Sequence, residues 1–218
     1  MTDENSTRHH LLFLSIGIIA LILGVTAWLI CFAPRPSTTG TVGMTTQKAT
    51  LLPQLKTLPP FSLTDQAGNR FDNQRLVGRW TFLSFGYTHC PDVCPTTLAM
   101  LTNMQQQLAA QTTVPTYQIA FVSIDPERDT PERLAEYVHY FDPDFLGITG
   151  SEEELQRLTR PLGILYEKVT EEQSAMGYVM DHSASIILID PEGRYQALFS
   201  PPHDARLMAE DFMAISRS

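Results

Sequence analysis

The sequence predicts an α/β domain with a central mixed sheet, preceded by one transmembrane helix. Strand-like apolar runs alternate with amphipathic helical segments, which favours a sheet with helices on both faces. The last two strand-like runs are separated only by a turn, so part of the sheet should be an antiparallel hairpin and its first half parallel. An uncharged apolar stretch of 23 residues lies before the domain.

That uncharged stretch covers residues 11–33. As a helix it would be roughly 34 Å long, close to the thickness of a bilayer's hydrocarbon core, which predicts a transmembrane anchor. A cleaved signal peptide is the alternative, but Pro34 makes a poor cleavage site. Residues 1–10 would then form a cytoplasmic tail. Residues 34–52, rich in Ser, Thr, Gly and Pro, would be a flexible linker, and residues 53–218 the folded domain.

The first half of the domain has the pattern of a hairpin, a buried strand and a helix. Turn residues within 61–71 separate two short apolar runs, which is typical of a hairpin. Residues 80–87, WTFLSFGY, are aromatic and apolar, as in a buried strand. A helix is expected over 94–111, where apolar residues recur at spacings of three and four. These residues are Leu98, Leu101, Met104 and Leu108.

The second half continues the alternation. Residues 117–125 resemble a buried strand, and Thr130 followed by a proline predicts a helix start. Ser151, with a glutamate three residues later, predicts another helix start. Strands at 184–190 and 194–200, and a closing helix from about 204, complete the domain.

The charge of the predicted domain excludes one class of partner. Residues 53–218 carry 22 acidic and 12 basic residues, a net charge of −10. Such a domain has no basic surplus to hold phosphates, so we expect no nucleic-acid partner.

Two cysteines, Cys90 and Cys94, lie in the motif HCPDVCP, where a predicted strand meets a predicted helix. A spacing of four residues brings the two sulfurs close together. The start of a helix lowers thiol pKa values, so both cysteines are expected to favour the thiolate, which attacks disulfides and binds metals. The spacing alone leaves a structural disulfide, a redox-active pair and a metal site open.

Three segments of the chain resemble the Sco/SenC family of membrane-anchored, thioredoxin-like copper proteins. They are GYTHCPDVCPTTL at 86–98, VSIDPERDTPE at 122–132 and DHSASIILIDPEGRY at 181–195. The resemblance extends over roughly residues 53–218 and implies a thioredoxin-like fold.

The resemblance also implies a site and a function. It implies that Cys90, Cys94 and His182 bind one copper ion. It further implies a metallochaperone that delivers copper to the copper A centre of cytochrome c oxidase subunit II, with a copper donor protein as a second partner. Two alternatives remain: a periplasmic thiol–disulfide oxidoreductase, with Cys90 and Cys94 as its redox-active pair, that reduces the acceptor's cysteines, or a copper or redox sensor.

The chemistry of these side chains favours copper. Two thiolates and an imidazole suit copper, whereas a structural zinc site takes four ligands and the domain has no third cysteine. A disulfide between the cysteines would expel the metal, which links redox state to metal loading. An ordinary thioredoxin-like oxidoreductase would have a cis-proline where Asp181-His182-Ser183 stands.

The orientation of the anchor is not decided by charge, because Arg8 and Arg35 flank it almost symmetrically. The short N-terminal tail and the two cysteines favour a bacterial inner-membrane protein with its domain in the periplasm.

Other side chains near the motifs are weaker ligand candidates. His89 adjoins Cys90, and Met176 and Met180 precede His182, but we expect none of the three to bind the metal. Asp92 and Asp181 could orient ligands or simply be solvated.

The remaining candidates are expected to have structural or solvated positions. His139 and His203 should be solvated, and His9 and His10 belong to the tail. Asp125, Arg128 and Asp129 should organise the turn before the helix. Residues 167–172, followed by Gly177, suggest either a mobile loop that would let His182 swing or a solvated hairpin.

Overall fold

The structure is a computed structural model that describes residues 28, 46–170 and 177–218. Residues 46–170 and 177–218 belong to one compact unit. The predicted tail, most of the linker and the predicted anchor apart from Trp28 lie outside the described residues. Among those that are described, no helix is both long and apolar enough to cross a membrane.

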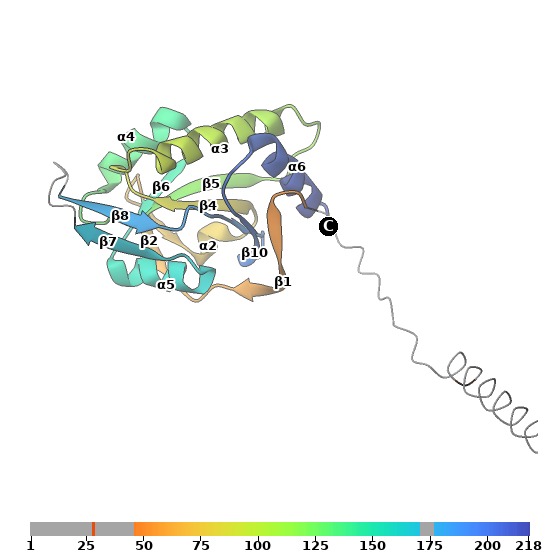
Figure 1. Ribbon diagram of the computed structural model, residues 1–218, viewed down its shortest axis with the longest axis horizontal. Helices are drawn as coiled ribbons and strands as arrows, with labels where there is room; N and C mark the ends of the chain where they lie inside the picture. Colours follow the sequence, from red (N-terminus) through yellow and green to blue (C-terminus); the bar gives the residue numbers. More distant parts are fainter. Residues whose placement is uncertain (1–27, 29–45, 171–176) are drawn as a thin grey trace, which may run out of the picture. The chain divides into compact units, whose positions relative to one another are not determined.

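A mixed eight-stranded sheet is the centre of the domain (Figure 1). Its strand order is β1 (Ala49–Thr57), β10 (Arg194–Phe199), β9 (Ile186–Ile189), β4 (Trp80–Gly86), β5 (Tyr117–Ser123), β6 (Leu146–Thr149), β2 (Ser62–Asp65) and β3 (Arg70–Asp72). The pairs β4–β5 and β5–β6 are parallel, and the other pairs are antiparallel. The predicted mixed sheet, with its parallel part and its late hairpin, is confirmed.

Helices cover both faces of this sheet (Figure 1). They are α2 (Asn73–Leu76), α3 (Val93–Ala109), α4 (Pro131–Phe141), α5 (Glu152–Leu162) and α6 (Ala205–Ile215). Figure 1 shows α3, α4 and α6 on one side of the sheet and α2 and α5 on the other. All seven residues of β4 are buried, as expected for a strand covered on both faces. β4 therefore forms a rigid base for the loop that follows it.

The helices begin where their capping residues predict. The side chain of Thr130 accepts a hydrogen bond from the backbone N–H of Arg133, and that of Ser151 accepts one from Glu154. Asp204 caps α6 in the same way through Leu207.

The predicted linker ends too late in the sequence. β1 begins at Ala49, four residues before the predicted domain boundary at 53, and pairs with β10. The carboxylate of Asp211 in α6 also accepts hydrogen bonds from the backbone N–H groups of Gln47, Lys48 and Ala49. These partners lie more than 130 residues away, so local composition does not reveal them.

A second, two-stranded sheet consists of β7 (Tyr166–Thr170) and β8 (Tyr178–His182), called here the hairpin. The mobile-loop interpretation of residues 167–172 is therefore wrong for 167–170, and the alternative of a solvated hairpin is correct there. β7 is mostly exposed, so it lacks the apolar alternation that identifies a strand. The last residue of β8 is His182, opposite Tyr166.

Candidate metal centre

Cys90 and Cys94 lie where the buried strand β4 leads into α3. The backbone N–H of Cys90 donates to the carbonyl of Tyr87 at 3.2 Å, which folds the connecting loop into a turn. Cys94 lies in the first turn of α3 and is 2% exposed, whereas Cys90 is partly exposed. Both thiols are free. The pair therefore has one sulfur in the core and one at the surface.

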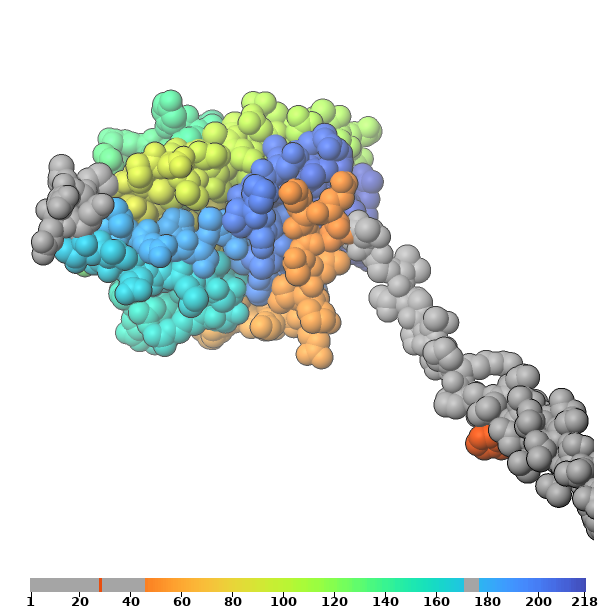
Figure 2. All heavy atoms as spheres, in the orientation of Figure 1, coloured from red at the N-terminus to blue at the C-terminus, as the bar shows by residue number. Residues whose placement is uncertain are grey.

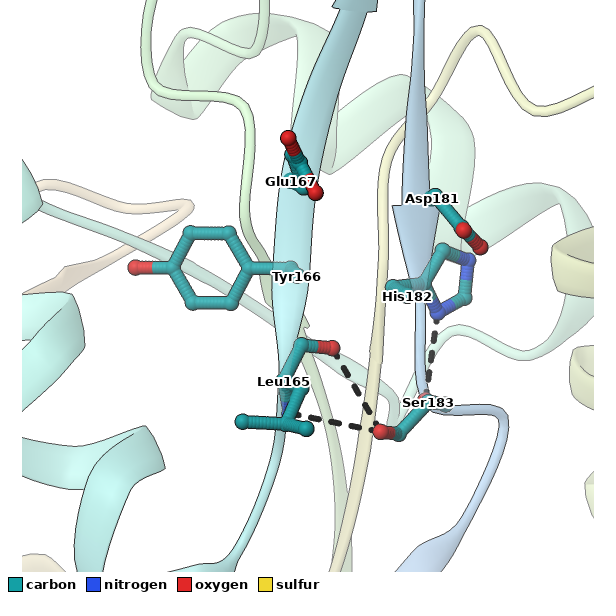
Figure 3. A pocket seen from close by; sticks show the side chains of 6 residues that line it. All are labelled: Leu165, Tyr166, Glu167, Asp181, His182 and Ser183. Carbon is teal, nitrogen blue, oxygen red and sulfur yellow. Dashed lines mark hydrogen bonds between the residues drawn. The ribbon is translucent and has the colours of Figure 1, made fainter.

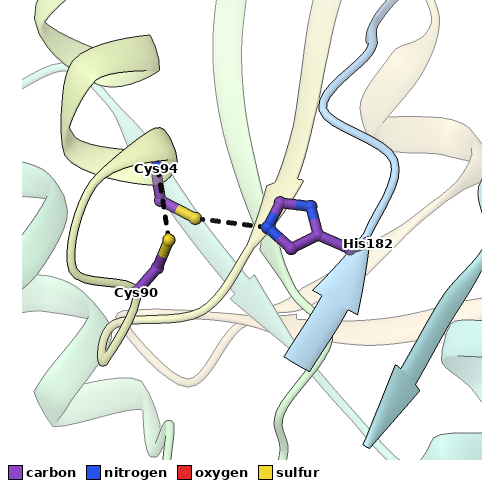
Figure 4. A group of neighbouring side chains, drawn as sticks. All are labelled: Cys90, Cys94 and His182. Carbon is purple, nitrogen blue, oxygen red and sulfur yellow. Dashed lines mark hydrogen bonds between the residues drawn. The ribbon is translucent and has the colours of Figure 1, made fainter. Parts of the chain in front are cut away.

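His182 reaches the same place from the hairpin (Figure 4). Its Nε2 lies 3.5 Å from the Sγ of Cys94, and its Nδ1 lies 3.2 Å from the carbonyl oxygen of Ser183. A carbonyl only accepts hydrogen bonds, so this contact places the proton on Nδ1. The lone pair of Nε2 is then free to face the sulfurs, as in metal-binding histidines.

The three side chains Cys90, Cys94 and His182, called here the ligand group, have the geometry of a metal site. Their ligand atoms all lie within 4.8 Å of one another. Three ligands arranged around one ion at about 2.3 Å would lie about 4 Å apart, so small movements suffice to close the site. In the part of the chain that the structure describes, no further Cys, His, Asp or Glu joins this group.

The two thiols differ in their pKa values. A hydrogen bond from the Cys94 thiol lowers the pKa of Cys90 to about 3, while that hydrogen bond and burial raise the pKa of Cys94 well above its ordinary value. The metal-free pair therefore carries one negative charge, on Cys90. The expectation that both cysteines favour the thiolate is wrong for Cys94, because its hydrogen bond with Cys90 and its burial oppose the effect of the helix start. A metal that binds both sulfurs must displace the Cys94 proton.

Gly86 makes room for the sulfur of Cys94. A Cβ atom at this position would lie 2.5 Å from the Sγ of Cys94 and 2.9 Å from Cε2 of Phe121. No side chain larger than hydrogen fits without displacing the thiol. Sequence reasoning missed this residue, although a glycine at the end of a buried strand is a signal of close approach.

Tyr87 is a second residue that sequence reasoning missed. It is 2% exposed, and its ring lies edge-to-face with the imidazole of His182, with 6.2 Å between the ring centroids. Burial raises the pKa of Tyr87, so its phenol stays protonated. Tyr87 therefore places an uncharged ring beside the imidazole of His182.

The weaker ligand candidates that the structure describes are not part of the ligand group. His89 turns toward Thr88, whose hydroxyl lies 3.1 Å from its Nδ1. Met180 is buried in the core, and Met176 lies outside the described residues. Asp92 and Asp181 are exposed, and Asp92 makes no side-chain cap hydrogen bond at the start of α3.

One expected solvated histidine is not solvated. His139 is exposed as predicted, and His9 and His10 lie outside the described residues. His203, however, is half-buried with its Nε2 2.8 Å from the carbonyl oxygen of Ala184, and burial lowers its pKa. His203 is half-buried because the loop before α6 packs against the segment that follows β8.

Asp129 organises the turn before α4, as predicted. Its carboxylate is buried and accepts hydrogen bonds from the backbone N–H of Thr88 at 2.9 Å and from the Ser123 hydroxyl at 2.6 Å. It thereby ties the loop that leads to Cys90 to the end of β5. Asp125 and Arg128 belong to the same turn and pair with each other.

The site opens toward solvent on the side of the hairpin. A hollow of about 500 Å³ adjoins His182 (Figure 3). Its lining residues are Leu165, Tyr166, Glu167, Asp181, His182 and Ser183. In the space-filling view, the surfaces of the hairpin and of the start of α3 adjoin each other (Figure 2). A partner can therefore approach the ligand group from outside.

A family model described as SCO1/SenC matches residues 49–217. The mitochondrial SCO1 homolog of Homo sapiens is 38% identical over 140 residues, covering 64% of this chain and 46% of that protein. An SCO2-like protein of Rickettsia prowazekii is 37% identical over 153 residues, covering 70% of this chain and 74% of that protein. The matched region is thus less than half of the human relative.

Solved structures show the same fold. The crystal structure of Arabidopsis thaliana ScoI with copper bound has a TM-score of 0.68 and 36% identity, covering 73% of this chain and 98% of that one. The solution structure of apo Sco1 from Thermus thermophilus has a TM-score of 0.67 and 32% identity, covering 81% and 99%. These likenesses support the predicted thioredoxin-like fold of the domain.

Proposed function

Since the chain belongs to the SCO1/SenC family, we propose that it binds copper through the ligand group and delivers it to the copper A centre of cytochrome c oxidase subunit II. The observation that carries this proposal is the convergence of two sulfurs and one imidazole nitrogen within 4.8 Å. Soft thiolates together with an imidazole suit copper better than hard cations. Related structures are described as having copper bound.

The arrangement suits copper as a cargo. Three protein ligands leave a coordination position for an incoming ligand from the acceptor. Cys90 is partly exposed and His182 lies beside an open hollow, so two of the three ligands are within reach of a partner. Transfer can then pass through species in which both proteins hold the ion.

Copper titration of the full-length chain under reducing conditions tests the binding step. We expect one copper ion per chain, with loss of binding in Cys90→Ser and Cys94→Ser. Cys31→Ser is the matched control, because Cys31 lies in the predicted anchor and should leave binding unchanged. Copper binding that survives both substitutions would overturn the site.

A thiol–disulfide oxidoreductase is the second candidate function. The pKa of Cys90, about 3, favours it, because a partly exposed thiolate can attack a disulfide of another protein. Cys94 can then attack the resulting mixed disulfide and release the reduced partner. His182→Ala separates the two functions in cells of the native host. Loss of oxidase assembly that added copper restores supports delivery, whereas normal assembly at limiting copper supports the reductase.

The location of the protein is part of the proposal. Residues 11–33 would anchor it in the inner membrane of a bacterium, with residues 1–10 in the cytoplasm and the domain in the periplasm. A periplasm-dependent reporter fused to the C-terminus should be active. Activity of a cytoplasm-dependent reporter alone would contradict this orientation.

A further inference from the structure

The hairpin that carries His182 is not part of the central sheet. β7 and β8 pair with each other and form a sheet of their own, separate from the eight strands that position the cysteines. A cavity of about 340 Å³ lies against the hairpin, with Ile124, Glu152 and Met180 in its lining. Tyr178 begins β8 at the end of the hairpin opposite to His182, and side-chain contacts join this end to the rest of the domain, so they help to set how β8 presents His182 to the sulfurs.

Arg128 makes the most extensive of these contacts. Its guanidinium carbon lies 3.6 Å from the ring centroid of Tyr178 in β8 and 5.5 Å from that of Tyr87 in the metal centre. Its Nη1 donates to the backbone carbonyl of Tyr178 at 3.2 Å. Only 16% of the Arg128 side chain is exposed, so water screens these contacts weakly.

Asp125 completes a closed triangle with these two residues. Its carboxylate, whose side chain is 2% exposed, accepts from the Nε of Arg128 and, at 2.8 Å, from the hydroxyl of Tyr178. Because Asp125 follows β5, the triangle joins the hairpin directly to the central sheet. Burial raises the pKa of Tyr178 to about 12, so its hydroxyl remains a donor.

The other polar side-chain contacts of the hairpin lie at the surface and are therefore weaker. Lys168 pairs with Glu127 at 2.7 Å, but the two side chains are 44% and 67% exposed. Exposed pairs of this kind contribute little and are screened by salt. Tyr166 donates to Glu152 at 2.8 Å, again at the surface.

We propose that Arg128 is a positioning residue that holds the hairpin through Tyr178 and thereby keeps the imidazole of His182 within reach of the two sulfurs. The proposal deepens the proposed function, since it explains what fixes the third copper ligand, and its copper readout rests on that function. Without the guanidinium, the hairpin keeps its own strand pairing but loses its fixed distance from α3. The ligand group would then behave as a pair of thiols with an intermittent imidazole.

Two measurements on the full-length chain test this role. In the metal-free protein, hydrogen exchange of the β7 and β8 amides in Arg128→Met should be faster by about tenfold, while β4 and β5 keep their protection. In the copper-loaded protein, the coordination spectrum of Arg128→Met should shift toward that of His182→Ala. Arg128→Lys, which keeps a cation near the ring, should lie between wild type and Arg128→Met in both measurements.

Arg194→Met is the matched control. Arg194 also donates through its Nε to a buried aspartate, Asp190, at 2.7 Å, but it is the first residue of β10 and makes no contact with the hairpin among the described hydrogen bonds and ion pairs. Arg194→Met should leave the hydrogen exchange of the β7 and β8 amides and the copper coordination spectrum as in wild type. If Arg128→Met does not fold, Tyr178→Leu removes the partner ring from a half-exposed position and should give the same two changes.

The outcomes separate this inference from the function on which it rests. If the β7 and β8 amides of both Arg128→Met and Tyr178→Leu exchange as slowly as those of wild type, the positioning role is overturned. An unchanged copper coordination spectrum in those variants would overturn it too. If the wild-type chain binds no copper, the proposed function fails, while the exchange measurement still decides whether Arg128 holds the hairpin. Equal loss of protection in β4 and β5 would show a general structural role instead and would also overturn the proposal.

Discussion

The two halves of the ligand group are built in different ways. Cys94 lies in a long helix packed on the central sheet, with its sulfur enclosed against Gly86 and Phe121. His182 lies at the end of a short strand that pairs only with β7 within a separate two-stranded sheet. The thiol half is fixed by the core, whereas the imidazole half is fixed by the contacts that hold the hairpin, among them those of Tyr178.

A site built in this way can both hold a metal ion and release it. Protein cores are close-packed and resist compression, so the positions of the two sulfurs should vary little. Small two-stranded sheets are marginally stable by themselves, so the imidazole can move at a lower cost in free energy.

The thiol half should show an abnormal pH dependence in the metal-free protein. Since the pKa of Cys90 is lowered to about 3, this thiol stays ionised as the pH falls from 8 to 5. An ordinary thiol with a pKa of about 8.5 loses its thiolate roughly a thousandfold over that range. Alkylation of Cys90 by iodoacetamide, measured by peptide mass spectrometry in Cys31→Ser, should therefore be nearly constant between pH 5 and 8.

Cys94→Ala is the control for that profile. It removes the hydrogen bond that lowers the pKa of Cys90, so alkylation should then increase steeply with pH. A steep increase already present with Cys94 intact would show that the thiols do not share their proton as the structure indicates.

The imidazole half should have a smaller effect. We expect His182→Ala to weaken copper binding by about ten- to a hundredfold, because one of three ligands is lost and the two sulfurs remain. Disulfide formation between Cys90 and Cys94 should proceed at a rate close to that of wild type. Competition titration against a chelator measures the first effect, and loss of free thiols under a mild oxidant measures the second.

His139→Ala is a suitable control, since that histidine is exposed in α4 and outside the ligand group. Wild-type copper affinity in His182→Ala would contradict the three-ligand site. A large change in thiol oxidation in the same variant would contradict the separation of the two halves.

The sequence predicted the fold best where local patterns and burial agree. The run WTFLSFGY and the capping residues Thr130 and Ser151 identified β4, α4 and α5, since a continuous apolar run and a side-chain cap are local signals. β1 was missed as a strand, and the hairpin was predicted only as one of two alternatives. The residues of β1 and β7 are mostly exposed, and β1 is fixed by partners distant in the sequence.

The site was predicted in the same uneven way. The motif HCPDVCP and the histidine of DHS led to all three members of the ligand group, through their resemblance to a family. The opposite pKa shifts of the two cysteines depend on burial and on a mutual hydrogen bond, which spacing does not reveal. Gly86 was missed because its role is to leave room for the sulfur of Cys94, and only the packed structure shows that the two residues meet.

Gly86→Ala should give the smallest effect and the most local one. The added methyl group would meet the Cys94 sulfur, so either the sulfur or β4 must shift, at a cost of about 1–3 kcal/mol in the free energy of unfolding. Gly147→Ala is the matched control, because its Cβ would lie 2.8 Å from the Cβ of Leu134, far from the thiols in the sequence and on another strand.

Denaturant unfolding should show comparable losses of stability for the two glycine variants. Only Gly86→Ala should also change the site. Its copper binding should be severalfold weaker, and the alkylation rate of Cys90, nearly constant with pH when Gly86 is present, should begin to depend on pH. Equal behaviour of the two variants at the thiols would mean that the core does not fix the sulfur of Cys94. The difference between the two halves of the ligand group would then lie in exposure alone, because neither half would be held by its packing.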